Sequence, residues 1–329
     1  MGTSNNKDKG LDMKGIFYSV MIAMFMIPII ALIVFYSQVT TSQNIAANIR
    51  ANEMQYFSES IEEDLLRFLQ INGKRAVVAA VNFTLTTGVG LEDARTNLTV
   101  IIENGTLNGT KIFDDQKNLS EWIQNISVIA SRSGFGINLT LLSFNVTQND
   151  SFSVLFSTLL YLNISDTSAS VGISKNMSAA AAVSIEGVVD PLYQIKTNGA
   201  IFKTIKKSPY IPFNKITLSS LEFTNLTNDI LNNSYHDSTQ GPSFLDRLEG
   251  KITLSPQYGP YGLESFVYLP DFIGAGLPVN TLLSDLDYQY WANVHGYYLK
   301  SSYQTGIYNW FRISTDNSYI ENDLLNTTS

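Results

Sequence analysis

The feature that most constrains this chain is an uncharged, apolar run near its N-terminus. No residue from Gly15 to Ile49 is charged, and residues 16–39 read IFYSVMIAMFMIPIIALIVFYSQV. A helix needs about 20 such residues to cross the hydrocarbon core of a bilayer, and aromatic pairs stand near both ends of this run. We therefore expect a retained, single-pass transmembrane helix over 16–39, kinked at Pro28. The alternative is a cleaved signal peptide, whose apolar region is shorter and ends at small residues.

The residues ahead of the run indicate its orientation. They include three lysines, and positively charged flanks favour the cytoplasmic side of a membrane. We therefore expect residues 1–15 to form a cytoplasmic leader and the rest of the chain beyond residue 39 to be extracellular.

Composition excludes several functional classes. Of the 329 residues only 15% are charged, the formal net charge is −8, and no basic run is longer than Lys206-Lys207. Nucleic-acid binding needs clustered Lys and Arg, so we expect no nucleic-acid partner. The chain has no cysteine, which excludes disulfides, Cys-ligated zinc and thiol catalysis.

Asn-x-Ser/Thr triplets are unusually frequent, and none precedes the apolar run. A chain this rich in Asn, Ser and Thr would contain about six by chance. We interpret the excess as N-glycosylation of an extracellular surface, which requires solvent-exposed asparagines. The alternative is a polar, β-rich surface with accidental triplets. The candidate sites are Asn82, Asn97, Asn104, Asn108, Asn118, Asn125, Asn138, Asn145, Asn149, Asn163, Asn176, Asn225, Asn232 and Asn326.

The remaining patterns predict an α+β fold. The transmembrane helix should continue into a helical stalk over about 41–71, ended by Asn72-Gly73, with an apolar stripe packed on its own sheet or on a neighbouring copy. Further helices are expected over 74–87, 91–103 and 119–131. An antiparallel β-meander, the head, should follow over 137–187, with turns at 148–150, 165–167 and 174–177. Residues 203–212 read as a linker, so the predicted domains are 40–209 and a second, Tyr-rich β domain over 210–329.

Strand periodicity makes the exposure of several asparagines testable. In the second strand of the meander, alternate residues from Phe152 to Ile164 should face inward, which turns Asn163 outward. A β-bulge near Leu142-Ser143 would turn both Asn138 and Asn145 outward. On the helix over 119–131, Asn118 and Asn125 should lie beyond the edge of the apolar stripe.

Candidate catalytic chemistry is sparse. His236, Ser243 and Asp246 could be imagined as a triad, but no nucleophile elbow accompanies them and a capped loop explains them as well. No metalloprotease, P-loop or dinucleotide motif occurs. We therefore expect no enzyme activity and no catalytic residue.

Two binding sites are conceivable in the stretch SDLDYQYW. Asp285 and Asp287 are candidate Ca²⁺ ligands, since hard oxygen ligands at alternate positions suit that ion. Tyr288, Tyr290 and Trp291 beside these acids could stack on a sugar. The alternatives are turn chemistry for the acids and core packing for the aromatics.

The N-terminal stretch KDKGLDMKGIFYSVMIAMFMIPIIALIVFYSQ resembles archaeal class III signal sequences, in which a charged leader ending in Lys-Gly meets a hydrophobic helix. The resemblance covers about the first 70 residues and implies processing around Lys14, Gly15 and Ile16. In pilin-like proteins that helix continues into a stalk capped by a β-sheet head. Val20 departs from the pattern, because assembling pilins commonly carry Glu there. The dense triplets and the absence of cysteine also resemble archaeal surface glycoproteins.

Together these patterns predict a non-enzymatic, N-glycosylated cell-surface structural protein, pilin-like or part of an envelope. Its expected partners are the lipid bilayer, covalent glycans, and other copies of itself or other surface proteins. The alternative is a membrane-anchored module that binds a glycan or a partner, as an adhesin does. An anchored hydrolase is the third hypothesis.

Overall fold

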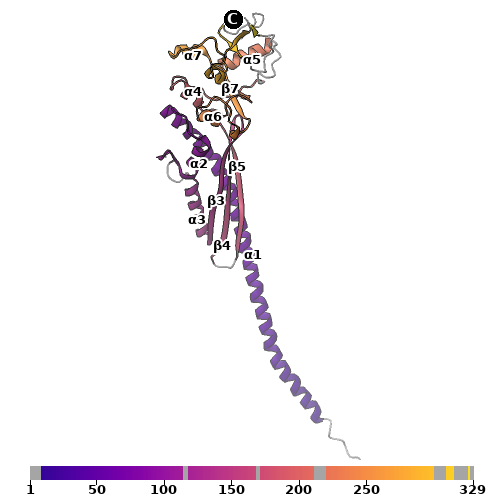
Figure 1. Cartoon of the computed structure of the whole chain (residues 1–329). Coiled ribbons are helices and arrows are strands. Elements are labelled where there is room, and N and C mark those ends of the chain that lie inside the picture. The colour runs from indigo at the N-terminus through magenta and orange to yellow at the C-terminus, as the bar shows by residue number, and fades with distance from the viewer. Residues whose placement is uncertain are drawn as a thin grey trace, which may run out of the picture.

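The computed structural model describes residues 9–113, 118–167, 171–210, 220–299, 309–314 and 325–326. The fold is α+β, with one very long N-terminal helix and several small antiparallel sheets. Helix α1 (Lys9–Thr87) has 79 residues, which at 1.5 Å per residue makes it about 120 Å long. Only its upper half lies beside the main sheet, and the C-terminal elements lie at the opposite end of the molecule from its free end (Figure 1).

Helix α1 does not break at Asn72-Gly73, so the predicted end of the stalk there is wrong. A Cβ atom at Gly73 would lie 2.9 Å from Phe156 Cδ2 and 2.9 Å from Val183 Cγ2. The glycine therefore lets the helix approach the sheet closely, a role that sequence alone does not separate from helix breaking. The helix also continues through Pro28.

Two shorter helices follow close to their predicted positions. Helix α2 (Ala94–Asn104) starts at the N-cap Asp93 and ends at Gly105, whose φ of 71° suits glycine. Helix α3 (Leu119–Arg132) starts at the N-cap Asn118. Between them lies a small hairpin of β1 (Thr106–Leu107) and β2 (Thr110–Lys111).

The main sheet has three long antiparallel strands in the order β3-β4-β5. These are β3 (Phe135–Asp150), β4 (Ser153–Asp166) and β5 (Gly172–Ser184). The register shifts between Leu141 and Ser143, which confirms the predicted bulge. The predicted turn at 174–177 is wrong, because β5 pairs with β4 without interruption from Gly172 to Ser184.

One face of this sheet forms the core with the helices. On β4 the inward residues Val154, Phe156, Leu160, Leu162 and Ile164 are fully buried, as their alternation predicted. Helix α1 packs across β4 and β5, and α2 and α3 pack on β3. The predicted apolar stripe of α1 is buried in its later part and exposed in its earlier part. Ile61 and Leu65 are buried in the chain's own core, whereas Ile45 and Ile49 are 55% and 53% exposed.

The sequence predicted a β-rich C-terminal domain. The described residues there form short helices as well as short strands. They form two small sheets, β6-β7 and β10-β8-β9. Gly and Pro interrupt the chain too often for longer elements. The elements from residue 191 are α4 (Pro191–Lys196), α5 (Ser220–Leu231), β6 (Tyr235–Ser238), α6 (Phe244–Leu248), the 3-10 turn η2 (Pro256–Tyr258), β7 (Gly262–Ser265), α7 (Leu269–Gly274), α8 (Asp287–Trp291), β8 (Tyr297–Leu299), β9 (Arg312–Ile313) and β10 (Leu325–Asn326).

The core runs across position 209, where the sequence predicted a domain boundary. Phe244, Leu245 and Leu248 of α6 belong to the same cluster of buried residues as the sheet and α1. The described part of the predicted linker is also packed: Lys203 is 4% exposed, and the peptide N–H of Asp190 donates to its carbonyl at 2.7 Å. Residues 203–210 therefore belong to the fold, and 211–212 lie outside the described residues.

Candidate functional site

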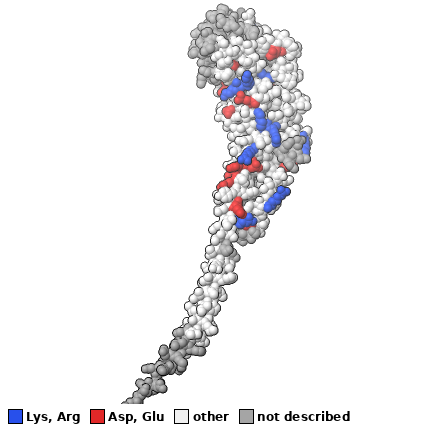
Figure 2. Space-filling view, turned by 180° about the vertical axis from the view of Figure 1, so that it is seen from behind, with Lys and Arg blue, Asp and Glu red and all other residues white. Residues whose placement is uncertain are grey.

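The first functional feature is the free end of α1. Every described side chain from Val20 to Thr41 is exposed, including Phe25 at 64%, Leu32 at 69% and Phe35 at 68%. Within the described residues, one helix is long and apolar enough to cross a membrane, and its most apolar window is not covered by any part of the chain. The described part of this segment carries no charge in Figure 2, whereas charges of both signs appear on the body above it. An apolar surface of this size marks a membrane or protein contact.

The predicted processing residues lie inside this helix. Lys14, Gly15 and Ile16 are helical, because α1 begins at Lys9. Part of the predicted 15-residue leader is therefore continuous with the apolar segment. Processing at these residues stays a prediction.

The second feature is the set of candidate glycosylation sites. Asn97 and Asn225 are half-buried, and the side chain of Asn326 lies outside the described residues. Ten of the fourteen asparagines are exposed: Asn82, Asn104, Asn108, Asn125, Asn138, Asn145, Asn149, Asn163, Asn176 and Asn232.

Asn118 is the exception, and its predicted exposure is wrong. Its side chain is only 9% exposed, because its oxygen accepts the N–H of Glu121 at 2.9 Å as the N-cap of α3. Helical periodicity does not apply to Asn118, because this residue stands just before the first residue of the helix. A sugar on Asn118 would have to displace the cap.

The open face of the main sheet gathers several of the exposed asparagines. Asn138 and Asn163 lie directly opposite one another on β3 and β4, and Asn176 on β5 pairs with Tyr161 on β4. Residues facing this side alternate with the buried ones, so they point away from α1, α2 and α3. These side chains are exposed and mostly small and uncharged, as in Thr140, Ser174, Ser178 and Ala180.

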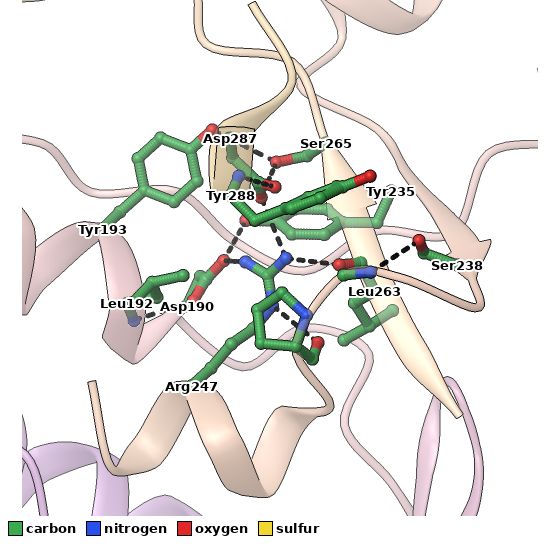
Figure 3. A network of polar contacts seen from close by, with 12 residues as sticks. Asp190, Leu192, Tyr193, Tyr235, Ser238, Arg247, Leu263, Ser265, Asp287 and Tyr288 are labelled. Carbon is green, nitrogen blue, oxygen red and sulfur yellow. Dashed lines mark hydrogen bonds and ion pairs between the residues drawn. The ribbon is translucent and has the colours of Figure 1, made fainter. Parts of the chain in front are cut away.

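The third feature is an ionic cluster centred on Arg247, whose side chain is fully buried. Figure 3 shows its polar contacts. Its Nη1 donates to Asp190 Oδ2 at 2.6 Å, and its Nη2 lies 2.9 Å from Asp287 Oδ2. The same guanidinium donates to the carbonyls of Leu263 at 2.6 Å and Pro242 at 3.4 Å. It therefore joins the N-cap of α4 to α6, β7 and α8 in one network.

Neighbouring hydroxyl groups also donate hydrogen bonds to the carboxylates of Asp190 and Asp287. Tyr235 donates to Asp190 at 2.8 Å, and Ser265 donates to Asp287 at 2.8 Å. Burial alone would lower the pKa of Arg247, but the attraction of Asp190 and Asp287 raises it above its ordinary value. The arginine thus stays charged and the network is held by opposite charges.

Two further buried ionisable groups border this cluster. Burial lowers the pKa of Lys203 to about 8, against the attraction of Asp287 and Asp190; its Nζ donates to the carbonyl of Phe266 at 2.8 Å. Burial raises the pKa of Glu264 to about 8, and its Oε2 has no hydrogen-bond partner among the described residues. Glu264 is therefore largely protonated near neutral pH.

Sequence reasoning did not single out Arg247 or Lys203. A signal was present, since Arg247 stands among apolar residues in FLDRL, where a solvated arginine is not expected. The two aspartates that pair with it lie 57 positions before it and 40 after it, so local patterns could not pair them.

The calcium candidates are placed differently from the prediction. Asp287 is engaged by Arg247 and Ser265, whereas Asp285 Oδ2 accepts the backbone N–H of Arg312 at 2.6 Å. Burial raises the pKa of Asp285 well above its ordinary value. Within the described residues, no group of three or more His, Asp or Glu side chains could hold a metal ion. Calcium binding by this pair stays a prediction.

His236, Ser243 and Asp246 do not form a catalytic triad. Ser243 and Asp246 form a capping box at the start of α6, which is the capped loop that the sequence also allowed. His236 Nε2 lies 2.9 Å from Asp229 Oδ2 instead, and Asp229 also accepts a hydrogen bond from Ser208 at 2.6 Å. This group is buried.

The aromatic residues proposed for sugar stacking lie in the core. Tyr288 and Tyr290 are each 8% exposed. Trp291 packs edge-on against Tyr193, with ring centroids 4.8 Å apart. Tyr288 and Tyr290 therefore present no open stacking surface, and Trp291 is half-buried against Tyr193.

Comparison with models of protein families, with curated proteins and with solved structures finds no match to this chain.

Proposed function

We propose that this chain is a single-pass membrane protein with a cytoplasmic N-terminus and an N-glycosylated extracellular domain of structural rather than catalytic role. The exposed apolar surface of α1 from Val20 to Thr41 carries the proposal. Residues 16–39 would form about 36 Å of helix, enough to cross a hydrocarbon core about 30 Å thick. In water this surface would be strongly unfavourable, whereas a bilayer would cover it.

The arrangement of the asparagines supports an extracellular, glycosylated domain. All fourteen triplets follow the apolar segment, and ten of their asparagines are exposed. Sugars on Asn138, Asn163 and Asn176 would cover the open sheet face. That face would otherwise expose a surface of mostly small, uncharged side chains.

The buried polar groups support a structural role. The charges of Arg247, Asp190 and Asp287 are enclosed by the fold and paired with one another, and His236 is buried against Asp229. Catalytic groups must reach a substrate, so enclosed and mutually paired charges favour a role in stability.

Exposed residues of α1 beyond the membrane favour self-association, as expected for a pilin-like or envelope subunit. Ile45, Ile49 and Tyr56 are 55%, 53% and 72% exposed, and they recur at helical spacing. Copies anchored in one membrane would present these residues at the same height, which favours pairing through α1. The partner-binding alternative is favoured by exposed apolar residues in the C-terminal part, Phe202 at 69% and Ile273 at 60%.

Single-cysteine variants test orientation, because the chain has no cysteine of its own. With a membrane-impermeant maleimide, Ala275→Cys, at an exposed residue after α7, should react in intact cells and Ser4→Cys only after permeabilisation. Reaction of Ser4→Cys in intact cells would refute the orientation.

The same approach separates self-association from partner binding. Ile49→Cys should form a disulfide-linked dimer on mild oxidation in native membranes, whereas the exposed control Ala275→Cys should not. A monomer in both cases would remove the self-association proposal and favour the adhesin-like alternative.

A further inference from the structure

We propose that the groove along the upper part of α1 is a docking site for the protein's own glycan on Asn82. The inference rests on the proposed glycosylation and goes beyond it, because it assigns a bound position to one sugar chain. It is based on a cavity of about 380 Å³ that Asn82 itself helps to line.

The groove has the chemistry of a carbohydrate site. Ile71, Val78 and Ala79 of α1 and Ile112 after β2 give it apolar walls, and Ile71 and Val78 are 53% and 40% exposed. Lys74 and Arg75 add positively charged donors to the lining. A sugar ring has an apolar C–H face and a rim of hydroxyls, so it needs apolar walls with a few well-placed polar groups.

The two cations are held in place by backbone and side-chain contacts. Lys74 Nζ donates to the carbonyl of Ser184 at 2.7 Å, and Arg75 Nη1 donates to Asn72 Oδ1 at 3.1 Å. A guanidinium has five N–H donors, so this contact leaves Arg75 with further donors for sugar hydroxyls.

Because Asn82 lines the groove, a glycan attached to it is the occupant that we propose. Ile71, Arg75, Val78 and Asn82 are separated by four, three and four residues, so they share one face of α1. From Asn82 to Ile71 the helix rises about 16 Å, which a short oligosaccharide can span. A tether of this kind gives an effective concentration in the millimolar range, so even a weak interaction would hold the glycan. A protein partner would have to displace the sugar to use the same surface.

Thr84, the third residue of the Asn82 triplet, indicates that the sugar is attached before folding is complete. Thr84 is fully buried, and its hydroxyl donates to the carbonyl of Val81 at 2.8 Å. A modifying enzyme that requires both Asn and Thr can reach this hydroxyl only before the helix packs. The groove then forms beside a glycan that is already present.

Limited periodate oxidation of the full-length protein from native membranes tests the inference. Periodate cleaves vicinal diols, and the oxidised sugars are read at each asparagine by glycopeptide mass spectrometry. At a docking Kd of about 0.1 mM and an effective concentration of about 1 mM, the Asn82 glycan should be oxidised about tenfold more slowly than the Asn176 glycan on the open sheet face. Denaturation should make the two rates equal.

Arg75→Gln should abolish most of this protection without affecting the Asn176 glycan, because Arg75 is an exposed residue of the groove. Equal oxidation rates in the folded wild-type protein would overturn the inference, as would a bare Asn82 in a protein glycosylated elsewhere. Bare asparagines throughout would instead overturn the proposed glycosylation itself.

Discussion

Replacing Arg247 with methionine would leave two carboxylates without their cation in the protein interior. The side chain makes four polar contacts, with Asp190 at 2.6 Å, Asp287 at 2.9 Å and two backbone carbonyls at 2.6 and 3.4 Å. Removing one partner of a buried ionic network typically destabilises a protein by about 3–5 kcal/mol, because the remaining charge is buried and uncompensated.

This loss should be large in a thermal unfolding experiment. For a domain of about 150–250 residues 1 kcal/mol shifts Tm by about 2–4 °C, so Arg247→Met should lower Tm by about 6–20 °C. Tryptophan fluorescence of the detergent-solubilised full-length protein is a suitable readout. Trp122 and Trp291 pack on Phe68 and Tyr193, so both report on described core contacts.

A matched variant separates lost charge pairing from lost packing. The triple variant Arg247→Met, Asp190→Asn, Asp287→Asn removes all three charges, and Asn remains a good N-cap at position 190. It should recover at least half of the lost Tm. A single variant that unfolds within about 2 °C of wild type would refute the reasoning.

Three further perturbations test other parts of the structure. Burial raises the pKa of Glu264 in the folded protein to about 8. The folded state therefore holds an extra proton between about pH 4.3 and 8, and the protein loses stability as pH rises through that window. Measured by denaturant unfolding, Glu264→Gln should become more stable relative to wild type as pH rises through the same window. Gly73→Ala should destabilise the protein by about 1–2 kcal/mol in the same assay, because overpacking against Phe156 outweighs the gain in helix propensity. Asn118→Ala should cost about 1 kcal/mol in the same assay, through the lost cap to the N–H of Glu121.

Each of these predictions has a contradicting result. An unchanged stability difference across pH would mean that Glu264 titrates near its ordinary pKa. A stabilised Gly73→Ala variant would mean that the helix does not approach the sheet as closely as its contacts indicate. An Asn118→Ala variant as stable as wild type would mean that the N-cap is dispensable.

Local patterns predicted the parts of this fold that depend on local geometry. Alternation along β4 gave its buried face and the outward position of Asn163, and the parity change near Leu141 gave the bulge. These inferences succeeded because side-chain direction in a strand follows from the backbone alone.

Other features depend on contacts distant in sequence, and patterns could not supply them. Gly73 has the local signature of a helix breaker, but its role is set by Phe156 and Val183 on the sheet. Lys203 looked like part of a polar linker, and only the surrounding fold places it beside the Arg247 cluster. The exposure of Asn118 was predicted wrongly for a local reason, because an N-cap side chain folds back onto the first turn of its helix instead of following the helical periodicity.

The most direct test of the central claim is a glycopeptide map of the protein taken from native membranes, together with its intact mass. The claim of an anchored surface glycoprotein predicts sugars on exposed asparagines such as Asn104, Asn108 and Asn176, on a chain that still contains residues 16–39. A mature chain that begins at Ile16 would favour the pilin-like form of the claim, and a retained leader would favour a permanent anchor. Bare asparagines throughout, or a chain that lacks the apolar segment, would contradict it.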